Sequence, residues 1–400
     1  MTEIAEFNPL SSYFEQNPYA EFKRMRESCR AYRHEGTLMP VVSFFHNADI
    51  RKMLGDWQTW SSQRSEEYNE KALGDAAILI GNDPPVHTQY REIVAPLFLP
   101  GEMAKLESSI LENCREYLGQ CLQAGEINFV EDYAANVTVA MICDMVGVPK
   151  QDRASMRKMT VELALEDGRP VFWKQPNPEV EARVARVMSE MDEYFTAHVE
   201  ERVCNPRDDI MSKIATQVEN RRHLIGMTLL MVAAGNETTT NLMAHGLQEL
   251  LRHPEQMQLL RDDPDTRMEG VVEEILRFRG TIRKQDRIAA IDTEIDGVQI
   301  NKGDSIALWN ASASRDPAVI PEPEKFDITR KPNRHLAFGS GIHMCIGNAL
   351  ARTELKIAMR YLLDNTSSIE LAKGDDSYES YKNGAVSYTH LRAHETTLDL

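Results

Sequence analysis

The chain has 400 residues, of which 42% are hydrophobic and 27% are charged, a composition typical of a globular protein. Its 62 acidic residues outnumber its 45 basic residues and give a formal net charge of −17, which argues against nucleic-acid binding because that function needs a basic surface. Six cysteines without paired spacing favour reduced thiols in a cytosol over a disulfide framework.

The N-terminal 30 residues are polar and lack the apolar core of a signal peptide. The longest apolar run, residues 224–234, is too short to span a bilayer. We therefore expect a cytoplasmic protein without a membrane anchor. No linker, repeat or low-complexity stretch divides the chain, so one large domain is favoured over the two or three that its length would allow.

Helical periodicity dominates the chain, and strand-like patterns are confined to two regions. The first strand-like region spans residues 32–45, and the second spans residues 287–308, where residues 293–300 are typical of a hairpin. The predicted helices cover residues 100–123, 180–204, 223–252, 266–278 and 348–364. These elements together predict a mainly α fold with a small β-sheet region.

Two basic residues follow the break Asp83-Pro84-Pro85, before the first long helix. His87 and Arg91 are separated by four positions, so they share one face of a helix. Taken singly each is typical of a surface, whereas together they could serve a buried anionic group.

The helix predicted over residues 223–252 contains an unusual segment, Ala234-Gly235-Asn236-Glu237-Thr238-Thr239. Glycine costs about 1 kcal/mol relative to alanine in a helix interior. A threonine hydroxyl such as that of Thr238 can bond to the carbonyl four residues earlier, which bends the helix and opens a small pocket. The alternative is a simple helix kink beside a solvated acid, Glu237.

The following helix carries Glu274 and Arg277, which are three residues apart and can pair on one face. Such a pair on a protein surface contributes only about 0.2–0.5 kcal/mol. The spacing also occurs by chance in many proteins, so this pair indicates a function only in combination with the other motifs of the chain.

The most informative segment runs from Phe338 to Gly347 and places Cys345 directly before the helix predicted over residues 348–364. Backbone N–H groups and the helix dipole at this position favour thiolate over thiol, and thiolate is the form that binds metal. Glycines in the segment allow flat backbone to approach a large planar group. The alternative is a structural thiol in the core.

Together these patterns resemble the cytochrome P450 monooxygenases of the soluble bacterial type. The family's cysteine loop, F-x-x-G-x-x-x-C-x-G, is matched at every fixed position, and so are its A/G-G-x-D/E-T and D-P-P-x-H-x-x-x-R patterns. The matching motifs follow the family's order over roughly residues 8–386. The resemblance implies the single-domain cytochrome P450 fold over residues 1–387.

The resemblance also implies a cofactor, haem b (iron protoporphyrin IX), with Cys345 as the axial ligand of the iron. Glu274 and Arg277 would form a buried pair that braces the cysteine loop. The family's third partner is an arginine in a P-x-R-F segment, where this chain has Lys325, so the triad is either weaker or completed differently. The remaining residues expected to contact the haem are His87, Arg91, Arg287 and His335 as propionate partners, and Ala234, Gly235, Phe338, Gly339, Gly341 and Gly347.

A thiolate ligand favours O–O cleavage. The implied reaction is therefore insertion of one atom of O2 into a C–H bond of a small apolar organic substrate. Thr238 would donate to the oxygen, and Glu237 would carry protons inward from solvent. By position, the substrate would lie against residues 78–80, Leu230, Ala234 and Ile282, with Arg283 and Lys284 as candidates for a substrate carboxylate.

Electrons would come from a separate ferredoxin-type donor with its reductase, since no flavin or iron–sulfur signature accompanies the haem motif. Arg352, Lys356 and Arg360 could form a basic docking patch, or else an ordinary solvated helix face. We expect a monomer. Two alternatives stay open, a peroxide-driven peroxygenase, whose members generally lack the acid–alcohol pair, and a non-catalytic haem-thiolate protein that binds a gas or another ligand.

The C-terminal segment departs from the family pattern. Family members end in a hairpin that reaches the substrate pocket, whereas residues 388–400 show no strand alternation and resemble translated adapter or vector sequence. We expect a non-native tail to replace the natural hairpin after Ser387, so that the pocket could lack one wall.

Overall fold

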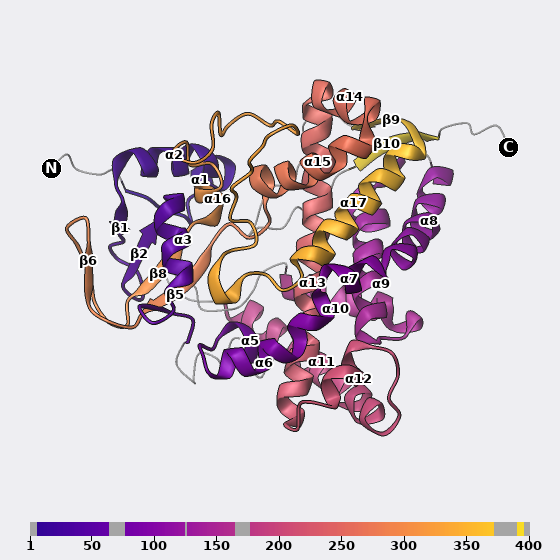
Figure 1. Ribbon diagram of the computed structural model, residues 1–400, viewed down its shortest axis with the longest axis horizontal. Helices are drawn as coiled ribbons and strands as arrows, with labels where there is room; N and C mark the ends of the chain where they lie inside the picture. Colours follow the sequence, from indigo (N-terminus) through magenta and orange to yellow (C-terminus); the bar gives the residue numbers. More distant parts are fainter. Residues whose placement is uncertain (1–5, 64–76, 125, 165–176, 372–389, 396–400) are drawn as a thin grey trace.

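The computed structural model describes residues 6–63, 77–124, 126–164, 177–371 and 390–395. Figure 1 shows a large body of helices on one side and a smaller region of strands, close to the N-terminus, on the other. This arrangement agrees with the predicted mainly α fold with a small β-sheet region. Among the described residues, every helix is too short or too polar to cross a membrane.

The helices of the described residues agree with the periodic segments of the sequence, except that the helix predicted over residues 100–123 is interrupted at Lys105 and Leu106, and several further helices are present. Their bounds are α1 Ser12–Gln16, α2 Pro18–Ser28, α3 Asn47–Gly55, α5 Ala77–Ile80, α6 Val86–Val94, α7 Pro100–Ala104, α8 Glu107–Ala124, α9 Ala135–Val146, α10 Arg153–Ala164, α11 Pro178–Cys204, α12 Ile210–Ala215, α13 Arg221–Arg252, α14 Pro254–Asp262, α15 Pro264–Arg279, α16 Asn310–Ala313 and α17 Asn348–Asp364. Short helical turns cover Ala95–Phe98, Phe129–Ala134, Lys150–Asp152 and Gly341–His343.

The main sheet has five strands in the order β1-β2-β8-β5-β3. Their bounds are β1 Ala31–Arg33, β2 Val41–Phe44, β3 Trp60–Ser61, β5 Gln285–Ala289 and β8 Ser305–Leu308. Strands β2 and β8 are parallel and buried at every residue, which explains their near-continuous apolar sequences. The sheet therefore joins the two strand-like regions of the sequence.

The predicted hairpin is formed by β6 (Thr293–Ile295) and β7 (Val298–Ile300). Asp296 and Gly297 connect these strands, and both have a positive φ, as a two-residue hairpin turn requires.

A second sheet has the order β4-β10-β9, with β4 at Glu126–Asn128, β9 at Thr366–Leu371 and β10 at His390–Glu395. Strand β10 lies in the segment whose sequence shows no strand alternation. The strand forms because β4 and β9 pair with its two edges, and their ladders satisfy its backbone without alternating side chains. Residues 372–389, which include Ser387, lie outside the described part, and the non-native origin of the tail stays a prediction.

Helix α13 is the centre of the helical body and is buried along most of its length. Two glycines allow its neighbours to approach closely. A Cβ on Gly235 would lie 2.9 Å from Cδ1 of Ile142 in α9, and a Cβ on Gly246 would lie 2.5 Å from Cδ1 of Ile275 in α15. A side chain at either position would therefore force the facing isoleucine to shift, and the two glycines favour close packing of α13 on α9 and α15.

Candidate active site

The loop before α17 holds Cys345 in a closed turn. The N–H of Cys345 donates to the carbonyl of Phe338 (2.9 Å). Gly339 and Gly341 both have φ near +70°, and a Cβ on Gly341 would lie 2.1 Å from the carbonyl oxygen of Leu54 in α3. The loop can pack on α3 only with glycine at position 341. The backbone therefore determines the position of the half-buried sulfur.

The electrostatics of the sulfur differ from the expectation that the loop favours thiolate. Burial raises the pKa of the Cys345 thiol, while the amide of Gly347 and the guanidinium groups of Arg91 and Arg352 lower it, and the net effect is an increase. Cys345 precedes the first residue of α17 by three positions. A bound metal cation would supply the stabilisation that a thiolate needs here.

The segment of α13 singled out in the sequence contains the predicted threonine hydrogen bond. The hydroxyl of Thr238 donates to the carbonyl of Ala234 (2.7 Å), and Ala234 is exposed although most of α13 is buried. The hydroxyl of Thr281 donates to the carbonyl of Thr238 (3.0 Å), which ties the helix to the segment after α15. Gly235 has a packing role against α9, so its contact with haem stays a prediction.

Glu237 is half-buried beside this pair. Burial raises the pKa of its carboxyl group, and a hydrogen bond from Asn241 and the charge of Arg157 partly oppose that rise. The group therefore holds a proton at a higher pH than a solvated glutamate does.

A basic cluster forms where α6, β5 and the cysteine loop meet. Its four members are His87, Arg91, Arg287 and His343. The rings of His87 and His343 lie 4.2 Å apart, and Arg91 donates to the carbonyl of Met344 (2.6 Å). Burial, followed by the charges of Arg287, His87 and Arg91, lowers the pKa of His343 to about 3. The cluster brings together three of the four predicted propionate partners.

The cluster has the chemistry of a site for anions. Within the described residues, both ring nitrogens of His87 and Nε2 of His343 are buried without a hydrogen-bond partner. Burial and the nearby Arg91 lower the pKa of His87. Unpartnered buried nitrogens are costly, and a carboxylate can accept a hydrogen bond from the N–H of each ring. The residues present therefore fit the two propionates of a haem.

His335, the fourth predicted partner, lies in a different set of contacts. Its Nε2 lies 3.0 Å from a carboxylate oxygen of Glu273, and its Nδ1 accepts from the N–H of Ala337 (3.2 Å). Glu273 also accepts from Arg352 (2.6 Å). Both ring nitrogens are thus occupied by protein groups, and a propionate contact by His335 stays a prediction.

The sequence analysis missed His343 in this role. The sequence did offer an indication of this role. His343 lies two residues before Cys345, and a side chain in the loop that carries the iron ligand must lie near the haem.

Glu274 and Arg277 form a buried ion pair, and both side chains are 0% exposed (2.7 Å). Glu274 also accepts from the N–H of Asp327 (2.8 Å) and from the amide of Asn333 (3.1 Å). Arg277 donates to the carbonyls of Ser314, Pro323 and Lys325. The pair therefore organises residues 314–333, which lead into the cysteine loop.

A different arginine completes this group. Lys325, at the family's arginine position, is exposed, whereas Arg330 places its Nε 3.3 Å from the carboxylate of Glu274. Arg330 also donates to the carbonyls of Pro321, Glu322 and Lys325. The planar guanidinium that Lys325 cannot supply comes from five residues later in the chain.

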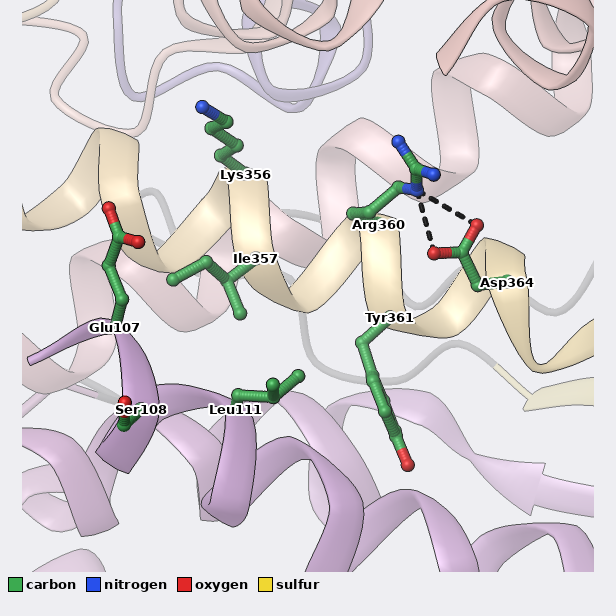
Figure 2. Close-up of a pocket in the computed structure, with 8 residues that line it drawn as sticks. All are labelled: Glu107, Ser108, Leu111, Lys356, Ile357, Arg360, Tyr361 and Asp364. Carbon is green, nitrogen blue, oxygen red and sulfur yellow. Dashed lines mark hydrogen bonds and ion pairs between the residues drawn. The ribbon is translucent and has the colours of Figure 1, made fainter. Parts of the chain in front are cut away.

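The predicted basic docking patch is largely neutralised. Arg352 pairs with Glu273 and lies over the ring of Phe338, and Arg360 pairs with Asp364 and Asp265. Lys356 has no ion pair among the described residues and borders a groove of about 360 Å³ between α8 and α17, which Figure 2 shows. Leu111, Ile357 and Tyr361 line this groove, and both acids and bases surround it, so the surface is mixed in charge.

The predicted substrate wall is apolar and accessible where the structure describes it. Ile80 and Ile282 are 46% and 44% exposed, and Leu230 is half-buried. The side chain of Ile78 lies outside the described residues. Lys284 forms an ion pair with Asp286 (2.6 Å), so a carboxylate of the protein already neutralises its ammonium group.

Comparisons with known proteins agree with this geometry. The chain matches the sequence model of a family described as "Cytochrome P450" over residues 8–388. It is 30% identical to "Cytochrome P450(MEG)" of Priestia megaterium, over 97% of this chain and 95% of that protein. It is 31% identical to "Cytochrome P450 monooxygenase PikC" of Streptomyces venezuelae, over 96% and 92% of the two chains.

Solved structures show the same fold. The crystal structure of P450BioI in complex with hexadec-9Z-enoic acid ligated acyl carrier protein has a TM-score of 0.88 at 26% identity, covering 96% of this chain and all of that one. The myxobacterial cytochrome P450 CYP267B1 in complex with myristic acid has a TM-score of 0.87 at 29% identity, covering 96% and 98% of the two chains.

Proposed function

Because this chain belongs to the cytochrome P450 family of haem b monooxygenases, we propose that it inserts one atom of O2 into a C–H bond of a small apolar substrate. Its electrons would come from a separate ferredoxin-type donor. The observation that carries this proposal is the junction of α6, β5 and the cysteine loop, where Cys345 lies beside a basic cluster with unpartnered nitrogens.

The residues that would hold the haem come from three separate parts of the chain. Cys345 would bind the iron, and His87, Arg91, Arg287 and His343 would bind the propionates. When bound, the haem supplies the redox chemistry that activates O2. The loop supports this ligation because the backbone hydrogen bond from the N–H of Cys345 to the carbonyl of Phe338 holds the residue that carries the sulfur.

Glu237 would deliver protons, and Thr238 would contribute a hydroxyl oxygen that accepts a hydrogen bond in the oxygen pocket. The Thr238 hydroxyl donates to the carbonyl of Ala234, so its oxygen lone pairs stay available to accept a hydrogen bond. Glu237 is half-buried, and its raised pKa brings the carboxyl closer to the pH at which it can both give up and regain a proton. This acid–alcohol pair favours the O2-dependent reaction over a peroxide-driven one.

An apolar substrate is supported by two observations. The accessible side chains of the predicted wall, Ile80 and Ile282, are aliphatic, and Leu230 lies half-buried on α13. Structures similar to this one contain apolar compounds, testosterone in CYP109E1 and myristic acid in CYP267B1. A panel of steroids and fatty acids, screened by the shift of the haem absorption band, would identify compounds that bind.

Thr238→Ala is expected to uncouple electron use from product formation. The substitution removes the hydroxyl that would pass protons while α13 keeps its backbone hydrogen bonds. With a compound from the screen, we expect the ratio of hydroxylated product to reduced nicotinamide consumed to fall at least about tenfold, since a positioned group in proton transfer typically contributes about 100-fold or more to a rate. Thr228→Ala is the matched control, because Thr228 makes the same type of bond on α13, to Leu224. Unchanged coupling in Thr238→Ala would refute the assigned oxygen pocket.

His343→Ala is expected to weaken haem retention more than His335→Ala. A hydrogen bond to a charged group contributes about 1.5–3 kcal/mol, which corresponds to a haem dissociation rate roughly 10–100 times faster. The rate is measured by transfer of haem to excess apomyoglobin. Faster loss from His335→Ala than from His343→Ala would show that the loop histidine is not the propionate partner.

A further inference from the structure

Glu237 is flanked on α13 by two buried asparagines with different partners. Asn241, one turn later, is 2% exposed and donates its amide to Oε1 of Glu237 (2.9 Å). Asn236, one residue earlier, is 1% exposed and directs its amide away from Glu237, toward α9 and α10.

The hydrogen bonds of Asn236 connect α13 to its neighbouring helices and do not involve the carboxyl group of Glu237. Its Nδ2 donates to the hydroxyl of Thr160 in α10, and its Oδ1 accepts from the hydroxyl of Thr138 in α9 (2.9 Å). Thr138 also bonds to Thr240 of α13 (2.7 Å). This buried polar network fixes the rotation of α13 beside its neighbours.

The side chain of Glu237 has fewer specific partners. The groups that act on it besides burial are the amide of Asn241 and the charge of Arg157 in α10. Two charged groups of α9 and α10 have partners of their own. Arg157 donates to the side-chain oxygen of Asn136 in α9 (3.3 Å), and the carboxylate of Asp144 in α9 pairs with Arg153 of α10. Among the described residues, Oε2 of Glu237 accepts no hydrogen bond, whereas Oε1 accepts the one from Asn241. Asn241 is therefore the side chain that restrains the orientation of this carboxyl group.

We propose that Asn241 is a positioning residue for proton transfer, which holds Oε1 of Glu237 so that Oε2 takes up and releases the proton. This inference rests on the proposed role of Glu237 as a proton carrier. A proton would arrive from solvent at Oε2 and leave from the same oxygen toward Thr238, so the carboxyl group is unchanged after each transfer. Without the amide, the side chain could rotate about its own bonds, and the carboxylate would lose its strongest specific stabilisation.

The test measures the ionisation of Glu237 directly in the haem-loaded protein. An infrared pH titration follows the carboxyl C=O band that Glu237→Gln removes. Asn241→Leu keeps a similar volume but removes the donor, so we expect the titration midpoint to move about one pH unit or more to higher pH. The pH profile of coupling should move with it. Asn236→Leu is the control for a change in the rotation of α13, since it removes a buried amide from the same helix without touching Glu237, and its midpoint should move clearly less than that of Asn241→Leu.

Two results would overturn the proposal, an unmoved midpoint in Asn241→Leu, or an equal shift in Asn241→Leu and Asn236→Leu. If the midpoint shifts only in Asn241→Leu but the coupling profile does not follow, Asn241 holds the carboxyl group without a part in proton transfer, which also overturns it. If Glu237→Gln leaves coupling unchanged, the proposed role of Glu237 fails, whereas a shifted midpoint in Asn241→Leu would still support the contact.

Discussion

Cys345→Ser is expected to abolish monooxygenase activity and the absorption spectrum of a thiolate-ligated haem. The serine hydroxyl is not deprotonated as a thiol is and is a much weaker ligand, so it cannot donate electron density to iron as a thiolate does. The loop itself should survive, because its closing hydrogen bond, from the N–H of residue 345 to the carbonyl of Phe338, is made by the backbone. The measurement is the absorption spectrum of the reduced protein with carbon monoxide, beside product formation with ferredoxin and reductase.

Cys204→Ser is the matched control, since Cys204 is an exposed free thiol at the end of α11. It should keep both the spectrum and the activity. If Cys345→Ser retained the thiolate-type spectrum, a different cysteine would be the ligand and the assignment of the loop would be wrong.

Glu274→Ala is expected to destabilise the protein by about 3–5 kcal/mol, the typical cost of leaving buried charges without their partner. Arg277 would keep a guanidinium that is 0% exposed, and Arg330 would lose the same carboxylate. The N–H of Asp327 and the amide of Asn333 would also lose their acceptor. Urea denaturation followed by circular dichroism measures the change, and haem content on purification reports on the cysteine loop.

Lys325→Ala is the control for this prediction. Lys325 occupies the position of the family's arginine but is exposed, so we expect its substitution to change the free energy of unfolding by no more than about 0.5 kcal/mol. If the free energy of unfolding of Glu274→Ala were within about 1 kcal/mol of that of the unsubstituted protein, residues 314–333 would not depend on this carboxylate. If Lys325→Ala lowered the free energy of unfolding more than Glu274→Ala did, Arg330 would not be the arginine that completes the Glu274–Arg277 group.

Two long helices, α13 and α11, were predictable from the sequence almost to their ends. The segment predicted at residues 223–252 is α13, Arg221–Arg252, and Asn220 caps its first turn through a side-chain oxygen. The segment predicted at 180–204 is α11, which begins at Pro178 behind the capping side chain of Asn177. Caps and periodicity are local properties, so a sequence carries them directly.

Helix α9 was not predicted, and its sequence explains why. Residues 135–146 are apolar on nearly every face and include several β-branched side chains, so they lack a helical period. The helix is buried against α13 and α8, and this tertiary packing determines its structure. The single helix predicted at 100–123 is likewise two, α7 and α8, separated at Lys105 and Leu106.

The sequence alone determined the parts of the candidate site that lie within one helix or one loop. These parts are the Cys345 loop, the neighbours Glu237 and Thr238, and the spacing of Glu274 and Arg277, because residues a few positions apart have a spatial relation that backbone geometry dictates.

Only the tertiary structure decided which distant side chains complete that site. It packs His343 against His87, brings Arg330 to Glu274 in place of Lys325, and engages His335 and Arg352 with Glu273. These contacts join residues up to 256 positions apart, from His87 to His343. Burial and charge pairing in the folded chain select such partners, and no spacing rule along the sequence encodes them.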